Sequence, residues 1–204
     1  MRSVWWLIGL AAVCWFVMFS PWTKAYVNFW GAMLGSTIVL GGAALWLGRA
    51  DRAEVYAFKP VYVLYGLAAV AFLYGFFWVG KLAATAILPF AQGQIQHVYD
   101  TKSQAPPWLI GLLLLGWIGP AEEIFWRGFV QFRMVKRYGV WVGLVVTTAI
   151  YALVHVWSGN FMLIMAAAIA GAFWGLLFQR CKSIWPGIIS HAIWDLLIFV
   201  VAPL

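Results

Sequence analysis

Charged side chains are scarce in this sequence of 204 residues: they make up 9% of it, and only six residues are acidic. A water-soluble domain carries about a quarter charged residues, so this chain has too little polar surface to cover a folded core in water. Its apolar composition also excludes intrinsic disorder. Hydrophobic residues account for 65% of the chain and aromatic residues for 19%. The composition therefore indicates an integral membrane protein.

Cysteine is nearly absent as well. Cys14 lies in the first apolar stretch and Cys181 in a basic loop, so the sequence predicts no disulfide framework. The first twenty residues resemble a secretory signal, because Arg2 precedes an apolar stretch, but they lack a small-residue cleavage site. We therefore interpret them as an uncleaved first membrane span.

Apolar stretches fill most of the chain. Seven of them approach the ~20 residues that a spanning helix needs, near 4–20, 26–48, 61–80, 108–132, 140–157, 161–179 and 184–202, and the third can continue to about Pro89. We predict an all-α polytopic membrane protein with about seven transmembrane helices. The polar connection 91–107 divides an N-terminal part, 1–105, with about three helices from a second part, 106–204, with about four.

Basic residues fall between the apolar stretches, so they report membrane orientation rather than nucleic-acid binding. With the N-terminus inside, the inner loops hold nine basic residues and the outer side holds Lys24, Lys81 and Lys102. The positive-inside rule then predicts an N-in, C-out topology. Such a compact chain suits a bacterial inner membrane, with the lipid bilayer as its constant partner and no nucleic acid.

Ionisable side chains gather in the last four predicted helices, although each one inside a span costs about 2.5–3.5 kcal/mol on insertion scales. They are Glu122, Glu123 and Arg127 in GPAEEIFWRGF, His155 in AIYALVHVWSGN, and His191 and Asp195 in ISHAIWDLL. A cost of this size indicates a function or an obligatory partner, and we place the candidate site here.

The spacing of the first group separates two roles. Glu123 and Arg127 are four residues apart with the acid first, which favours an ion pair on one helix face, and we interpret this pair as a structural clamp. Glu122 points about 100° away and is free to face another group. Gly119 and Pro120, directly before the carboxylates, predict a break or kink that opens space for water or substrate.

The histidines lie on two other predicted helices. His191 and Asp195 are also four residues apart, so Asp195 could hold a proton of His191. His155 alone would be interpreted as an interhelical hydrogen bond, but the second histidine–acid pair favours a shared site. Counted from the inner loops, Glu122 and His191 lie about 14–16 Å deep and His155 about 22 Å deep. Helix tilt must reconcile these depths if His155 belongs to the site.

Three motifs on separate helices resemble those of a known family. They are E-E-x-x-x-R at Glu122, Glu123 and Arg127, aromatic-x-x-x-His at Tyr151 and His155, and H-x-x-x-N/D at His191 and Asp195. In this order they resemble the CPBP family (CAAX protease and bacteriocin-processing, or Abi) of intramembrane proteases, which includes the type II CAAX prenyl endopeptidases. The resemblance covers about residues 106–200 and leaves the first three helices outside.

The resemblance implies a glutamate-dependent endopeptidase. Glu122, with His155, would hold and deprotonate a water that attacks the scissile carbonyl, and His191 with the residue at 195 would stabilise the oxyanion. A carboxylate base and fixed donors in a dry site suit this chemistry. The family has asparagine where this chain has Asp195, and an ionised aspartate would repel an oxyanion. The substrate would be a peptide or protein segment delivered from the membrane, such as a prenylated tail, a leader peptide or a sorting helix.

Other functions stay open at this stage. Glu122, His155 and His191 are a plausible zinc ligand set with an open fourth position, but no H-E-x-x-H helix exists, and we favour a mechanism without metal or other cofactor. A bacteriocin-immunity or membrane binding protein of the same fold would lack hydrolysis. A transporter or proton conductor is less favoured, because neither inverted repeats nor paired broken helices are present.

Overall fold

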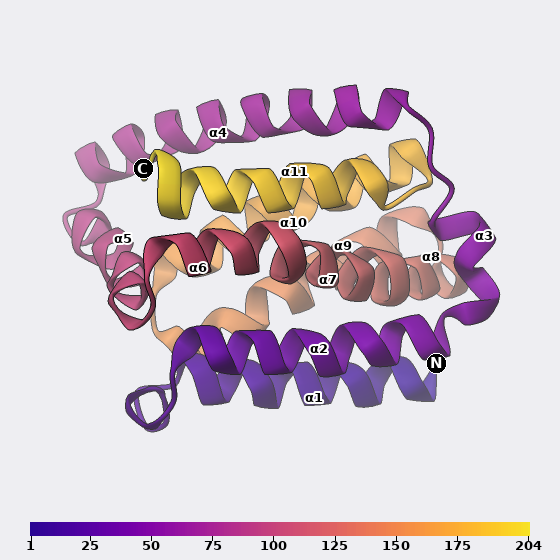
Figure 1. The fold of residues 1–204 in the computed structure, drawn as a ribbon, viewed down its shortest axis with the longest axis horizontal. Coiled ribbons are helices and arrows are strands. Elements are labelled where there is room, and N and C mark those ends of the chain that lie inside the picture. The colour runs from indigo at the N-terminus through magenta and orange to yellow at the C-terminus, as the bar shows by residue number, and fades with distance from the viewer.

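The chain forms a bundle of long helices and contains no strand, as the computed structural model describes it over residues 1–204. Figure 1 shows these helices running along a common axis, with the two chain termini at opposite ends of the bundle. Six helices are long and apolar enough to cross a membrane, and the last apolar helix, Trp185–Val201, is shorter. The prediction of an all-α polytopic membrane protein is confirmed.

The first half of the chain contributes three long helices. They are α1 (Arg2–Phe19), α2 (Phe29–Leu47) and α4 (Val61–Ile87), joined by the short elements η1 (Lys24–Tyr26), η2 (Arg49–Asp51) and α3 (Arg52–Val55). The helix α4 takes the longer of the two expected lengths. The polar connection that follows is itself helical, because it contains α5 (Ala91–Tyr99) and η3 (Asp100–Gln104).

The second half contributes four more long helical segments, each built from one or more consecutive helical elements, and we call them rods. The first of them is continuous over Pro107–Tyr138 and consists of α6 (Pro107–Leu113), η4 (Leu114–Ile118), α7 (Gly119–Glu123), η5 (Ile124–Gln131) and α8 (Phe132–Tyr138). The others are α9 (Val140–Leu153) with η6 (Val154–Ser158), α10 (Phe161–Cys181), and α11 (Trp185–Leu196) with η7 (Leu197–Val201).

The helix is not broken at Gly119 and Pro120, although the sequence predicted a break or kink there. Both residues open α7, and the backbone widens into π-helical turns on either side, η4 and η5. Wide turns of this kind absorb a local mismatch in the hydrogen-bond ladder and are common at functional sites. Gly119 has a second role: a Cβ there would lie 2.9 Å from the Cα of Ala192, so its hydrogen allows α7 and α11 to approach closely.

The largest of three buried hydrophobic clusters joins the two halves. It takes buried side chains from α1 and α2 and from the rod at 107–138. Trp15 of α1 and Trp126 of η5 meet edge to face, with ring centroids 6.3 Å apart. The N-terminal helices therefore pack directly against the part of the chain that carries the ionisable residues.

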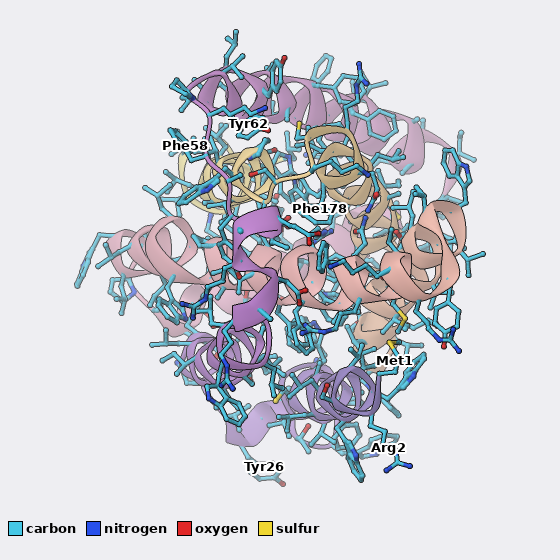
Figure 2. All side chains as sticks on the ribbon, turned by 90° about the vertical axis from the view of Figure 1, so that its right-hand side faces the viewer. Met1, Arg2, Tyr26, Phe58, Tyr62 and Phe178 are labelled. Atoms are coloured by element: carbon cyan, nitrogen blue, oxygen red, sulfur yellow. The ribbon has the colours of Figure 1, made fainter.

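The end of the bundle that holds the N-terminus also holds a network of ion pairs. Asp51 contacts Arg133 at 3.0 Å and Lys136 at 3.4 Å, and Glu54 contacts Lys136 at 3.3 Å. Figure 2 looks onto this end and shows Arg2 at its edge. This grouping places together the loops that the sequence assigned to the inner side of the membrane.

Candidate active site

A cavity of about 420 Å³ lies among the helices and is mostly apolar: 27 of its 33 lining residues are hydrophobic. Its polar lining includes Glu122, His155, His191 and Asp195, together with Tyr151. The structure thus brings the four residues that the sequence proposed as catalytic to the wall of one cavity, although they come from three separate rods.

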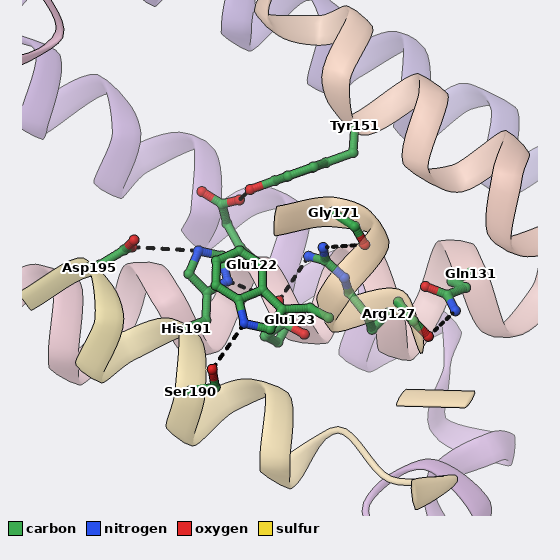
Figure 3. Close-up of polar contacts among 11 residues, drawn as sticks. Glu122, Glu123, Arg127, Gln131, Tyr151, Gly171, Ser190, His191 and Asp195 are labelled. Carbon is green, nitrogen blue, oxygen red and sulfur yellow. Dashed lines mark hydrogen bonds and ion pairs between the residues drawn. The ribbon is translucent and has the colours of Figure 1, made fainter. Parts of the chain in front are cut away.

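The predicted pair between Glu123 and Arg127 is confirmed. Arg127 Nη1 donates to Glu123 Oε1 at 2.8 Å, and both side chains are buried. The other end of the guanidinium donates to the carbonyl of Gly171 on α10 at 3.3 Å. The clamp therefore fastens the rod at 107–138 to α10 (Figure 3).

Glu122 turns away from this pair, as its position on the helix predicted. Its Oε2 accepts a hydrogen bond from the hydroxyl of Tyr151 at 3.1 Å. Its Oε1 receives no hydrogen bond from the protein, and the residue lines the cavity. One carboxylate oxygen is therefore held by α9, and the other is free to bind a water.

His191 lies between two acids. Its Nδ1 is 2.9 Å from Glu123 Oε1, and its Nε2 is 3.5 Å from Asp195 Oδ2 (Figure 3). The shorter contact shows that Glu123, which the sequence assigned to the structural clamp alone, also orients His191. The imidazole stacks on Trp174 of α10, with ring centroids 3.7 Å apart and planes within 17°. Its orientation is thus fixed by an acid at its edge and an indole on its face.

His155 has protein partners on both ring nitrogens. Its Nε2 accepts a hydrogen bond from Trp15 Nε1 at 3.1 Å, and its Nδ1 donates to the carbonyl of Tyr151 at 2.8 Å. It makes no direct contact with Glu122. Tyr151, four residues earlier on the same rod, does contact Glu122. Four residues correspond to about 6 Å of helix, which matches the difference in depth between Glu122 and His155 that the sequence left unexplained.

Three residues of the site were missed as site residues from the sequence. Tyr151 had been recognised only as the aromatic position of a motif, and its spacing of four from His155 is the signal that could have found it. Trp174 supports His191 and donates to Ser190 Oγ at 3.1 Å. No pattern marked Trp174 or Ser190, because the chain has 15 tryptophans and neither residue carries a charge.

Glycines allow the helices to close around the buried acids. A Cβ at Gly187 of α11 would lie 2.5 Å from Glu123 Oε2, and one at Gly175 of α10 would lie 3.0 Å from Gln131 Oε1. Gln131 uses the room at Gly175 to donate to its carbonyl at 2.9 Å. A larger residue at either glycine would displace a buried polar side chain.

The side chains are not gathered as a metal site. No group of three or more histidine, cysteine, aspartate or glutamate residues is placed to hold a metal ion. The three residues of the alternative zinc set, Glu122, His155 and His191, do not converge on one point, because His155 Nε2 faces Trp15.

The fold and the site together define a polytopic α-helical membrane protein with a buried acid–histidine cluster at an apolar cavity. Residues 104–197 match the family model described as type II CAAX prenyl endopeptidase, Rce1-like. Over this segment the chain resembles the Rce1-like family, and the resemblance to the CPBP proteases is confirmed. This family consists of proteases, so the match supports an enzyme. No curated protein and no solved structure matches the chain.

Proposed function

We propose that this protein is an intramembrane endopeptidase in which Glu122 is the general base. The observation that carries the proposal is the arrangement of its carboxylate: Oε2 is held by Tyr151, whereas Oε1 has no protein partner in a residue that lines the cavity. A base must reach the proton that it removes, either directly or through one water. Oε1 satisfies this requirement for a water in the cavity.

The reaction follows from this geometry. Glu122 removes a proton from the water as the water oxygen attacks the scissile carbonyl carbon, and the electron pair of the carbonyl moves to its oxygen. When the tetrahedral intermediate collapses, the carbon–nitrogen bond breaks and Glu122 returns the proton to the leaving amine. A positioned general base of this kind contributes about 10²–10⁴-fold.

His191 is the proposed donor to the oxyanion in its imidazolium form: Nδ1–H donates to Glu123, and Nε2–H is the donor that remains for the oxyanion. Contacts with Glu123 and Trp174 hold its ring in place, and fixed donors in a dry site stabilise developing charge strongly. Asp195 stands beside the second nitrogen of the ring. His155 lines the same cavity, but both of its ring nitrogens have protein partners, so we propose Glu122 alone as the group that binds the water.

The proposed substrate is a peptide segment that enters from the bilayer. The cavity is walled by apolar residues of α4 and α10, among them Phe76, Phe77, Met165 and Ile169. Such walls fit an apolar leader, a sorting helix or a prenylated C-terminal tail, and the last of these matches the name of the family. We propose that the enzyme lies in a cell membrane, namely the bacterial inner membrane.

The proposal is tested with purified protein in lipid nanodiscs and a panel of quenched fluorescent peptides, some prenylated and some carrying an apolar leader. Glu122→Gln keeps the shape of the side chain but cannot accept the proton. Cleavage should therefore fall by at least about 100-fold while the thermal unfolding transition remains. Glu54→Gln, at an exposed ion pair on α3, is the matched control and should cleave normally.

Two outcomes of this assay would contradict the proposal. A folded Glu122→Gln protein that cleaves at the normal rate would exclude Glu122 as the base. A wild-type protein that binds the peptides but cleaves none of them would instead match a binding or immunity protein of the same fold.

The same assay tests the proposal that no metal is needed. We expect activity to survive dialysis against EDTA and zinc to be well below one atom per chain. Activity that is lost on chelation and restored by zinc would favour the metal-dependent alternative.

A further inference from the structure

We propose that Tyr151 is a positioning residue for Glu122: its hydroxyl orients the carboxylate and stabilises its ionised form. The catalytic meaning of this inference rests on the proposed function, but the contact itself can be tested without any substrate. The inference adds to the site a residue that lies outside the charged and histidine positions of the three motifs.

The contact is isolated and specific. Tyr151 is the one protein group that donates to Glu122, at 3.1 Å from its Oε2, and both side chains are buried. Both also line the cavity, so the hydrogen bond lies at the wall where a substrate would arrive. Because the hydroxyl occupies Oε2, the free Oε1 is the oxygen left for the water.

The tyrosine ring is packed on several sides and so holds its hydroxyl in one place. The Arg127 guanidinium lies 4.8 Å from the ring centroid, and the Trp126 ring meets it at 5.2 Å with an interplanar angle of 73°. On the side of α10, a Cβ at Gly171 would lie 2.8 Å from Tyr151 Cδ1. Cation–π and edge-to-face contacts such as these favour a single ring orientation.

Arg127 thereby reaches both neighbouring glutamates by different routes. It binds Glu123 directly through its guanidinium, and it supports Glu122 through the ring of Tyr151. The two acids point in different directions from one helix, yet a single cation and a single aromatic ring organise them. Without the hydroxyl, the Glu122 carboxylate would have no donor, and its charged form would lose a stabilising hydrogen bond.

The first test replaces the hydroxyl with hydrogen in Tyr151→Phe. The readout is labelling of Glu122 by dicyclohexylcarbodiimide, which reacts with protonated carboxyl groups, measured by mass spectrometry as a function of pH. Loss of a donor to the ionised form should move the midpoint of labelling to higher pH. Tyr74→Phe is the matched control, because its hydroxyl donates at 3.1 Å to a backbone carbonyl, that of Ala202.

In the peptide cleavage assay, Tyr151→Phe should lower kcat by about ten-fold or more, the usual effect of losing a hydrogen bond to a charged group, and should leave KM nearly unchanged. The acid limb of the pH profile should move to higher pH together with the labelling midpoint. A purely structural role would lower the amount of folded protein without moving either pH profile.

The second test keeps the hydroxyl and moves the ring. Gly171→Ala introduces a methyl group against Tyr151 Cδ1, so it should shift the labelling midpoint and lower kcat in the same directions as Tyr151→Phe. Gly42→Ala on α2 adds a methyl group where nothing lies within 4 Å and should change neither. This pair keeps the inference testable if Tyr151→Phe fails to fold.

The outcomes separate this inference from the proposed function. Unchanged labelling and kcat in both Tyr151→Phe and Gly171→Ala would overturn the positioning role, even if Glu122→Gln is inactive. Shifted labelling with normal cleavage by Glu122→Gln would keep the contact but remove its catalytic meaning, and the proposed function would fail instead.

Discussion

At the scale of single residues, the two neighbouring glutamates of the site bind different side chains. Glu122 accepts from Tyr151, whereas Glu123 binds both Arg127 and His191 through its Oε1. One glutamate is thus available for the proposed role of general base, whereas the other is bonded to Arg127 and His191. This division makes different predictions for their variants.

Arg127→Ala should destabilise the fold more than Glu122→Gln does. Removal of one partner from a buried pair leaves an uncompensated charge and costs about 3–5 kcal/mol, and Arg127 also supports Tyr151 and Gly171. Thermal unfolding in detergent measures the difference. Lys136→Ala, in half-exposed pairs with Asp51 and Glu54, is the control and should cost about 0–1 kcal/mol. Equal melting temperatures for the variants of Arg127 and Glu122 would contradict the clamp.

Asp195→Asn should keep cleavage within about ten-fold of the wild type, whereas Asp195→Ala should lose about 100-fold, as for a lost oxyanion donor. A protonated aspartate donates through its hydroxyl as an amide donates through N–H. The geometry supports this prediction, because Glu123 at 2.9 Å, rather than Asp195 at 3.5 Å, makes the close contact with His191.

Measured cleavage by the two Asp195 variants decides between the possible roles. Two equally inactive variants would show that Asp195 acts as an ionised acceptor for His191 and not as a donor.

At the scale of elements, the site depends on how closely the rod at 107–138 approaches α11. Glu122 and Glu123 lie on α7, and His191 and Asp195 lie on α11. Gly119 meets the backbone of Ala192, so the distance between the acids and His191 is set where these two helices touch. The π-helical turns η4 and η5 lie directly before and after α7, so they flank the two acids.

Gly119→Ala should therefore impair both stability and cleavage. Its Cβ would lie 2.9 Å from a backbone atom, and such overpacking costs about 1–3 kcal/mol while it separates α7 from α11. Gly116→Ala, three residues earlier on the same rod, has nothing within 4 Å and serves as the control. Normal melting and cleavage by Gly119→Ala would show that the close approach does not set the geometry of the site.

At the scale of the whole molecule, the N-terminal helices belong to the same packed body as the matched segment. Trp15 of α1 binds His155, and Phe29, Trp30 and Met33 of α2 line the cavity. The segment that matches the protease family is thus completed by helices outside the match. The opposite ends of the bundle differ in charge, which predicts how it sits in the membrane.

The predicted N-in, C-out topology can be measured with single cysteines in a chain whose two native cysteines are replaced. A membrane-impermeant maleimide should label Ser103→Cys in intact cells, and it should label Arg137→Cys only after permeabilisation. Both positions lie in polar segments at opposite ends of the bundle, and the positive-inside rule assigns them to opposite sides. Labelling in the reverse order would contradict the predicted orientation.

The sequence by itself determined the fold class and drew attention to the ionisable residues of the candidate site. Its apolar stretches have the length of membrane spans, and helices satisfy every backbone group in lipid, so the rods could be predicted from composition and length. The pairing of Glu123 with Arg127 and the separate direction of Glu122 also followed, because both depend only on the period of one helix.

Only the tertiary structure decided which residues meet across helices. The contact of Tyr151 with Glu122, the second bond of Glu123 to His191 and the bond from Trp15 to His155 join positions 29, 68 and 140 residues apart. Such contacts depend on how the helices rotate and approach one another, and that is set by the shapes of packed side chains and by glycines such as Gly119. Helical periodicity places residues on a face of their own helix, but it does not choose the helix that covers that face.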